Sequence, residues 1–163
     1  MLPEATLEDA SRLLDELKHR NWTIATAESC TGGLISAALT SVPGCSSCVV
    51  AGFVTYSNDA KNSMLDVPAE MIESVGAVSQ EVARRMVEGA LRHSGADIAV
   101  SCTGVAGPTG GSAEKPVGLV HMAAGRAGGE VIARHRVFPG DRTAIRAATV
   151  AETFALVREL LER

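Results

Sequence analysis

Residues 27–33, Ala-Glu-Ser-Cys-Thr-Gly-Gly, join a strand pattern directly to a helix pattern and place two candidate nucleophiles at the junction. The preceding residues 22–26 mix β-branched, aromatic and small side chains without a breaker, which is typical of a strand. Apolar side chains at helical spacing predict a helix at about 31–41. At such a turn the free N–H groups of the helix start can hold a phosphate or an oxyanion, and the two glycines allow close approach. An ordinary helix cap by Ser29 or Thr31 is the alternative interpretation.

Strand and helix patterns alternate through the first hundred residues, and a hairpin pattern follows them. Helices are predicted at about 6–20, 31–41, 59–65, 68–74, 79–94 and 142–161, and strands at 22–26, 48–55, 97–101, 117–124 and 131–137. The nearly continuous apolar run at 48–55 is typical of a strand buried on both faces. Gly128-Gly129 suits a hairpin turn, so the fifth strand should run antiparallel to the fourth. This order predicts one α/β domain over residues 1–163, a three-layer α/β/α sandwich around a mixed five-stranded sheet with one antiparallel strand.

Composition argues against several classes of protein. The net charge of −4 disfavours a general nucleic-acid binder, although a local basic pocket for one phosphate stays possible. No run of 18 apolar residues predicts a membrane span, and the first residues show no signal-peptide pattern, so we expect a cytoplasmic chain whose cysteines are thiols. Cys45 and Cys48 form a C-x-x-C pair, but no second pair accompanies it and it precedes a strand. We therefore expect small buried residues there and no metal site.

Three loops follow the carboxyl ends of predicted strands, at 27–33, 56–61 and 103–115. Ligands of such sheets bind in the crevice beyond the carboxyl ends of the strands. We therefore expect the polar side chains of these loops to converge, together with several glycines. They are Ser29, Tyr56, Asn58, Lys61 and Thr103.

A serine needs a base to become a nucleophile, and the four histidines lie in unsuitable places at helix ends or within hairpin strands. Lys61 is better placed, because a lysine desolvated in a pocket can lose its proton near neutral pH. The chain has only three lysines and otherwise uses arginine, which cannot act as a base. A solvated helix residue is the alternative for Lys61. Cys30 is a rival nucleophile to Ser29, because thiols ionise more easily.

Several motifs in register resemble the CinA C-terminal domain family over residues 7–161. The matching stretches are residues 27–33, Tyr-Ser-Asn at 56–58 with Lys61, Gly-Ala-Val-Ser at 76–79, Thr-Gly-Val-Ala-Gly-Pro at 103–108, Glu-Lys-Pro-Val-Gly at 114–118 and Phe-Pro-Gly-Asp-Arg at 138–142. The family includes stand-alone nicotinamide mononucleotide amidohydrolases, and full CinA proteins carry an additional N-terminal domain that we do not expect here. The resemblance implies hydrolysis of nicotinamide mononucleotide to nicotinate mononucleotide and ammonia, a step of pyridine nucleotide recycling.

The resemblance also implies roles for individual residues. Ser29 aligns with the nucleophile, Lys61 with the general base of a Ser-Lys pair, and Tyr56 with an assisting residue. The expected substrate-binding residues are Thr31, Gly32, Gly33, Asn58, Thr103, Gly104, Gly107 and Arg142. No metal or cofactor is implied, and the expected partners are a small nucleotide and a second copy of the chain in a homodimer. The loop departs from the family at Thr109, where a glycine is more usual.

The sequence is compatible with two other functions. One is a catalytically silent nucleotide-binding or regulatory module, which would keep the pocket without turnover. The other is an amidase that acts on a different small amide. Release of ammonia from a panel of nicotinamide compounds distinguishes the three.

Overall fold

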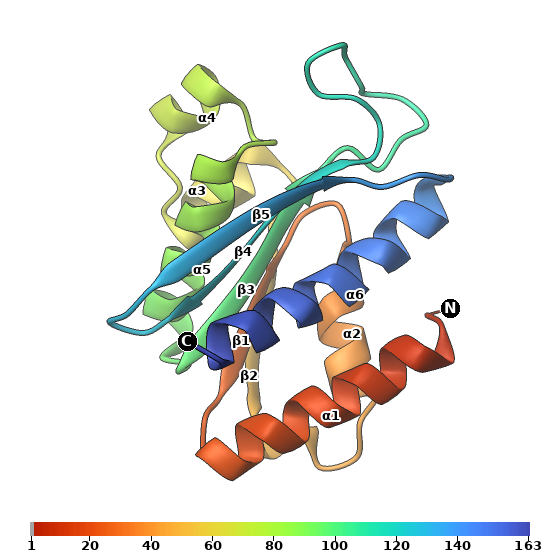
Figure 1. Ribbon diagram of the computed structural model, residues 1–163. Helices are drawn as coiled ribbons and strands as arrows, with labels where there is room; N and C mark the ends of the chain where they lie inside the picture. The colour runs from red at the N-terminus through yellow and green to blue at the C-terminus, as the bar shows by residue number, and fades with distance from the viewer. Residues whose placement is uncertain (1) are drawn as a thin grey trace.

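The elements of the computed structural model, which describes residues 2–163, follow the predicted order (Figure 1). The helices are α1 (Glu4–Arg20), α2 (Leu34–Thr40), α3 (Asn58–Leu65), α4 (Ala69–Val75), α5 (Gln80–Ser94) and α6 (Arg142–Leu161), with a 3₁₀ turn, η1, at Cys45–Ser47. The strands are β1 (Ile24–Glu28), β2 (Val49–Val54), β3 (Ile98–Gly104), β4 (Leu119–Arg126) and β5 (Val131–Val137). Within these residues, no helix has both the length and the apolar character that a membrane crossing requires.

The five strands form one mixed sheet in the order β2-β1-β3-β4-β5. β1 pairs in parallel with both β2 and β3, whereas β4 runs antiparallel to β3 and to β5. The turn between β4 and β5 is closed by a hydrogen bond from the Gly129 amide to the Arg126 carbonyl. The predicted sheet, with one strand opposed to the others, is confirmed.

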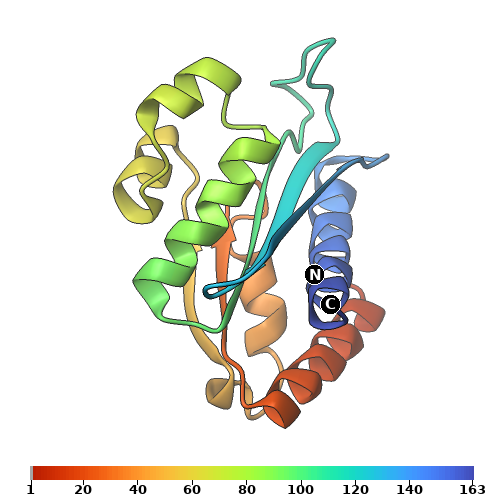
Figure 2. The same cartoon turned by 60° about the vertical axis from the view of Figure 1, so that its left-hand side comes forward.

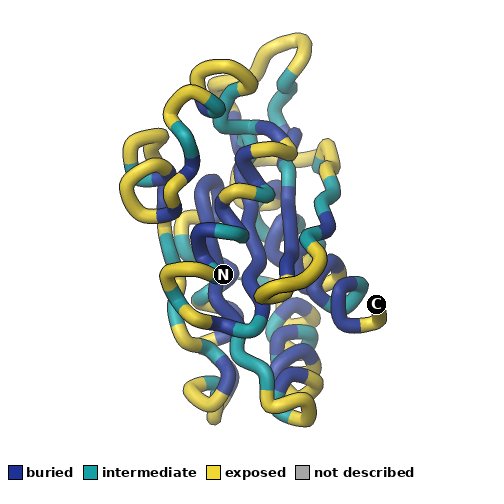
Figure 3. Tube along the Cα trace, turned by 90° about the vertical axis from the view of Figure 1, so that its left-hand side faces the viewer, coloured by how far each residue is buried: buried dark blue, intermediate teal, exposed yellow. Residues whose placement is uncertain are grey.

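Helices cover both faces of this sheet, as the three-layer prediction required (Figure 2). On one face, α5 packs along the strands with α3 and α4 beside it, and Met86 and Val87 of α5 are fully buried. On the other face, α1, α2 and α6 share a core that includes Leu14, Leu17 and Phe154. Figure 3 shows the buried residues concentrated in the central strands and the exposed ones on loops and outer helix faces.

Two sequence-based expectations are corrected by the structure. The first strand lies two residues further along than predicted, so Glu28 is its last residue and not part of the turn. The strand β2 is not buried on both faces, because exposure alternates along it and Val50 and Val54 are about half exposed. The physical reason is its position, since β2 stands at the end of the strand order, beside β1.

Candidate active site

The segments at the carboxyl ends of β1, β2 and β3 meet at one end of the sheet and enclose a cavity of about 220 Å³. Most of the predicted site side chains lie around it, together with residues from the start of α6 and from the connection before α5. It is lined by Ser29, Cys30, Tyr56, Asn58, Lys61, Ala77, Val78, Thr103, Gly104, Ala106 and Arg142. The expected convergence of loops is therefore present in the fold.

Ser29 and Lys61 form the closest polar pair in this cavity. Ser29 follows β1 directly and is 8% exposed, and its amide donates to the Cys102 carbonyl at 3.1 Å. Lys61 lies one turn into α3 and is 1% exposed. Its Nζ is 2.9 Å from Ser29 Oγ, 2.8 Å from the Thr55 carbonyl and 3.2 Å from the Tyr56 carbonyl. The alternative of a solvated helix residue at position 61 is therefore wrong.

Three hydrogen-bond partners around one amine define what each protonation state can do. A lysine ammonium has three N–H donors, which match Ser29 Oγ and the two carbonyls of Thr55 and Tyr56. After loss of one proton, two N–H donors still serve the carbonyls and the lone pair faces Ser29 Oγ. Burial lowers the pKa of Lys61 from its ordinary value, because desolvation disfavours the ammonium. The geometry thus suits an amine that takes the serine proton.

The local sequence explains why Lys61 reaches this position. Ser57 caps α3, since its hydroxyl accepts the Ala60 amide at 3.0 Å, and the helix therefore begins at Asn58. Lys61 is then buried in the first turn, and its amine reaches the carbonyls of Thr55 and Tyr56, the two residues that follow β2. Asn58 itself is exposed and lines the cavity mouth.

Arg142 connects the far side of the cavity to Tyr56. Asp141 caps α6 by accepting the Ala144 amide, which places Arg142 at the first helical position. The guanidinium donates to the Tyr56 hydroxyl at 3.0 Å and to the Gly107 carbonyl at 2.8 Å. It also borders a second cavity of about 420 Å³, so this cation is available to a ligand that extends from one cavity to the other.

Thr103 and Gly104 form the floor of the cavity at the end of β3. The Thr103 hydroxyl is buried and donates to the Ala77 carbonyl at 2.9 Å, which ties β3 to the segment before α5. Gly104 lies against β4 so closely that an added Cβ would be 2.7 Å from the Leu119 carbonyl oxygen. A larger residue at this position would therefore push β3 and β4 apart beside the cavity.

The amides at the start of α2 are already bonded to a carboxylate. Glu28 is fully buried, and its two oxygens accept the Ile35 amide at 2.8 Å and the Ser36 amide at 2.9 Å. The Thr31 hydroxyl also donates to Glu28, at 2.7 Å. These two amides are therefore not free for a phosphate or an oxyanion, which corrects that expectation, and the helix cap is supplied by Glu28 and not by Ser29 or Thr31.

The remaining glycines predicted for substrate binding do not line the 220 Å³ cavity. Gly32 faces the Arg146 side chain, and Gly33 lies beside Val54. Gly107 contributes its carbonyl to Arg142. All three have positive φ, between +59° and +103°, so their role in the structure is to make turns that other residues rarely adopt.

Sequence reasoning missed two residues that hold the turn after β1 in place, Glu28 and Arg146. The Arg146 guanidinium donates to the Cys30 carbonyl at 3.1 Å and to the Thr31 carbonyl at 2.9 Å. It lies one helical turn beyond Arg142, so α6 presents both arginines to the site. The spacing of the two arginines, four residues apart, was the available signal.

Glu28→Gln is expected to destabilise the protein by about 1–3 kcal/mol, because the amide NH₂ would face a backbone N–H that has lost its acceptor. The exposed loop residue Glu114 supplies the matched control, and Glu114→Gln should leave stability unchanged within about 0.5 kcal/mol. Urea denaturation of the two variants measures both effects. Equal stability of Glu28→Gln and wild type would contradict the role of this carboxylate as the cap of α2.

Other candidate groups fit catalysis less well. A hydrogen bond with Cys102 and burial raise the pKa of the Cys30 thiol well above its ordinary value, so Cys30 stays protonated near neutral pH. His121 packs against His135 in the hairpin, with ring centroids 5.3 Å apart, and neither lines the cavity. Within residues 2–163 no cluster of His, Cys, Asp and Glu side chains is arranged to hold a metal ion.

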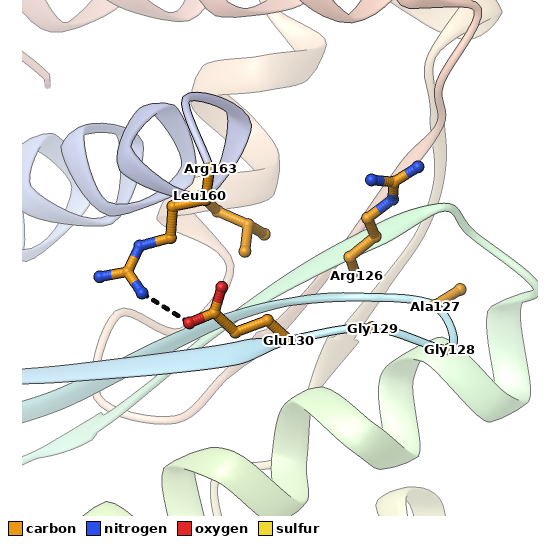
Figure 4. A pocket seen from close by; sticks show the side chains of 7 residues that line it. All are labelled: Arg126, Ala127, Gly128, Gly129, Glu130, Leu160 and Arg163. Carbon is orange, nitrogen blue, oxygen red and sulfur yellow. Dashed lines mark hydrogen bonds and ion pairs between the residues drawn. The ribbon is translucent and has the colours of Figure 1, made fainter.

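A larger hollow of about 390 Å³ lies at the opposite end of the sheet, where the β4–β5 hairpin meets the end of α6 (Figure 4). Figure 4 shows the Arg163 side chain directed toward Glu130, with which it forms an ion pair, while Arg126 points elsewhere. The residues that line this hollow include no serine, cysteine, histidine or lysine. It therefore offers no nucleophile and base, in contrast to the cavity around Ser29.

Comparisons with known proteins agree with this fold. The nicotinamide-nucleotide amidohydrolase PncC of Pseudomonas putida is 52% identical over 92% of this chain and 92% of its own length. A competence-damage inducible protein of Symbiobacterium thermophilum is 48% identical, but the chain spans only 38% of that longer relative. The crystal structure of a competence/damage inducible protein from Agrobacterium tumefaciens superposes with a TM-score of 0.95, at 46% identity and 98% coverage of both chains. Because the profile of the CinA C-terminal domain also matches residues 7–161, this chain belongs to the CinA C-terminal domain family.

Proposed function

We propose that this protein hydrolyses the carboxamide of nicotinamide mononucleotide to nicotinate mononucleotide and ammonia. The observation that carries the proposal is the buried Lys61 amine 2.9 Å from Ser29 Oγ in a small cavity. The name of the P. putida relative, which is 52% identical over nearly its whole length, supports the choice of substrate. The product would re-enter pyridine nucleotide synthesis, so the reaction is one of nucleotide recycling.

In the first half of the proposed reaction, Ser29 Oγ attacks the carboxamide carbon while the neutral amine of Lys61 takes the serine proton. The ammonium of Lys61 then protonates the departing nitrogen. The C–N bond breaks, ammonia leaves, and the acyl group stays on Ser29 as an ester. The carbonyls of Thr55 and Tyr56 hold the amine in place throughout, because they accept its other protons.

In the second half, Lys61 is neutral again and takes a proton from a water molecule that attacks the ester carbonyl. The bond between the carbonyl carbon and Ser29 Oγ breaks, and the proton returns from Lys61 to the serine. Nicotinate mononucleotide leaves and the starting state is restored. Every proton in this cycle moves between Ser29, Lys61, water and the substrate, so the chain's own residues supply the chemistry.

Arg142 is the proposed partner of the substrate phosphate. It is a planar donor fork at the start of α6, it borders both cavities, and its present acceptors are neutral oxygens of Tyr56 and Gly107. A phosphate would accept from it more strongly than either neutral oxygen, because the bond would be charge-assisted. The pyridine carboxamide would then lie at Ser29 and the phosphate toward the second cavity.

We expect kcat/KM for nicotinamide mononucleotide to exceed that for nicotinamide riboside by about 10- to 100-fold, the worth of one or two charge-assisted hydrogen bonds. Arg142→Met should remove most of this preference. Arg12→Met, a change on the exposed face of α1, should keep it. Ammonia release from the mononucleotide, the riboside and free nicotinamide measures all three ratios.

The same assay distinguishes the rival functions. Equal rates on the three compounds would remove the phosphate site from the proposal. Binding of the mononucleotide without ammonia release would indicate a silent nucleotide-binding module. Turnover of another small amide alone would indicate an amidase of different specificity.

A further inference from the structure

The Arg146 side chain lies against the turn after β1, which carries Ser29. Its Nε donates to the Cys30 carbonyl at 3.1 Å, and its Nη2 donates to the Thr31 carbonyl at 2.9 Å. The same guanidinium lies beside Gly32, where an added Cβ would be 3.4 Å from Nη2. Two donors of one planar group therefore hold two successive peptide units of this turn.

The contacts of Arg146 differ from those of another arginine in the same helix. Arg158 of α6 forms ion pairs with Asp9 and Glu16. Arg146 is only partly exposed, yet within residues 2–163 it forms no ion pair with a carboxylate. Its charge is directed at the carbonyls of one turn, and hydrogen bonds of this charge-assisted kind are stronger than those between neutral groups.

The Cys30 carbonyl depends on Arg146 more than the Thr31 carbonyl does. The Thr31 carbonyl also accepts the Leu34 amide at 3.2 Å, whereas within residues 2–163 the Cys30 carbonyl has no donor other than Arg146. Cys30 is 5% exposed. Because a buried carbonyl without a donor is costly, loss of Arg146 would favour a shift of this peptide unit, which follows Ser29 directly.

The proposed catalytic pair is assembled from two segments, and the turn after β1 holds only one of them. Lys61 is fixed from the side of α3, by the carbonyls of Thr55 and Tyr56. Ser29 Oγ is carried by the turn and is 2.9 Å from Lys61 Nζ. A displacement of the turn by about 1 Å would take these two atoms beyond hydrogen-bond distance, and a misplacement of this size can cost about 10²-fold in rate.

The helix α6 brings Arg146 to the turn from a well-buried base. It packs beside α2, the helix that follows the turn (Figure 1). Its residues Ile145, Val150 and Phe154 are at most 1% exposed. Arg142 lines the cavity around Ser29, whereas Arg146 lines neither this cavity nor the one of about 420 Å³. Arg146 is therefore placed to act on the turn and not on a bound substrate.

We propose that Arg146 is a positioning residue, which holds Ser29 within reach of the Lys61 amine through its two hydrogen bonds to the turn. This inference rests on the proposed function, because it assigns Arg146 to the same reaction. A residue that orders the nucleophile without touching the substrate lowers kcat and leaves KM nearly unchanged when it is lost. The preference for the phosphorylated substrate should also persist, in contrast to its loss in Arg142→Met.

The test compares Arg146→Ala with the matched control Arg84→Ala. Arg84 is also partly buried and donates to a backbone carbonyl, that of Val131 at 2.7 Å, but it belongs to α5 and does not line the cavity. We expect Arg146→Ala to lower kcat for ammonia release by about 30- to 100-fold with KM within about threefold, and Arg84→Ala to keep the wild-type kcat. Loss of stability against urea in both variants, with wild-type kcat in both, would show a merely structural role and overturn the proposal.

Restoring the lost group provides a second arm of the test. Guanidinium ion at millimolar concentrations, well below those that unfold proteins, should raise kcat of Arg146→Ala by about tenfold and leave wild type and Arg84→Ala unchanged. Arg146→Lys keeps the charge without the planar fork, so its kcat should lie between those of wild type and Arg146→Ala. It is also the variant to measure if the alanine variant fails to fold. Wild-type kcat in Arg146→Lys, or an Arg146→Ala enzyme that does not respond to guanidinium, would overturn the proposal.

Covalent labelling of Ser29 by a fluorophosphonate separates the role of Arg146 from the choice of substrate. The reagent phosphonylates an activated serine with loss of fluoride and contains no amide, so the labelling rate, followed by mass spectrometry, reports on Ser29 alone. We expect labelling of Arg146→Ala to be slowed by about the same factor as kcat. Slow labelling of this variant, beside a wild type that is labelled but releases no ammonia, would support the role of Arg146 and contradict the proposed substrate. Equal labelling rates of wild type and Arg146→Ala would overturn the role of Arg146, whatever the substrate.

Discussion

Ser29→Ala is expected to lower kcat for ammonia release from nicotinamide mononucleotide by about 10⁴- to 10⁶-fold, the usual cost of removing a covalent nucleophile that works as a unit with its base. The alanine keeps the backbone hydrogen bond to the Cys102 carbonyl, so the turn and the fold should persist. Steady-state ammonia release, with unfolding by urea as a check on the fold, measures the effect.

Cys30→Ala is the matched control for this experiment, because Cys30 is the next residue, lines the same cavity and carries the rival nucleophile. Its thiol is held protonated by burial and by the hydrogen bond with Cys102, so we expect this variant to keep most of the wild-type activity. A folded but inactive Cys30→Ala enzyme, or a Ser29→Ala enzyme near the wild-type rate, would transfer the role to the thiol.

Lys61→Arg is expected to reduce turnover by about 10³-fold or more, although it keeps a positive charge at the site. A guanidinium does not lose its proton in proteins and therefore cannot take the proton of Ser29. Lys61→Met removes both the charge and the base, and it should be as inactive as Lys61→Arg. Comparison of kcat for the two variants separates a base from a fixed charge.

Activity in the Lys61→Arg variant would contradict the role of Lys61 as a base. Substantial turnover by this variant would mean that residue 61 acts through its charge, and another group would have to activate the serine. Unfolding by urea is measured for both variants, because position 61 is almost fully buried. The larger arginine side chain in particular must fit beside the carbonyls of Thr55 and Tyr56.

Some elements could be predicted closely because their ends carry local signals. The bounds of β5 and α6 agree with the predicted 131–137 and 142–161, since a glycine pair marks the hairpin and Asp141 is a strong helix cap. The error at β2 has a physical origin. A short apolar run is compatible with a strand covered on both faces and with one exposed at a sheet edge, and only the order of the strands decides between them.

The candidate site likewise contains residues that the sequence predicted and residues that it did not. The proximity of Ser29 and Lys61 could be predicted from a general property of α/β sheets. The carboxyl ends of their parallel strands lie at the same end of the sheet, so the loops that follow these strands converge. The roles of Glu28 and Arg146 could not be predicted, because each acts through backbone groups of other segments that only the folded chain brings near. A carboxylate at the last position of a strand, just before a serine, gives no sign in the sequence that it will cap the next helix.

The pH dependence of kcat/KM for nicotinamide mononucleotide tests the central claim, a neutral Lys61 that activates Ser29, most directly. Burial lowers the pKa of Lys61 in the folded protein, and only the deprotonated amine can accept a proton, so activity should rise with pH through this ionisation. We predict a single rise centred below 10.5, the ordinary value for lysine, and its absence in Lys61→Arg. A wild-type profile without this rise, or the same rise in Lys61→Arg, would contradict the claim.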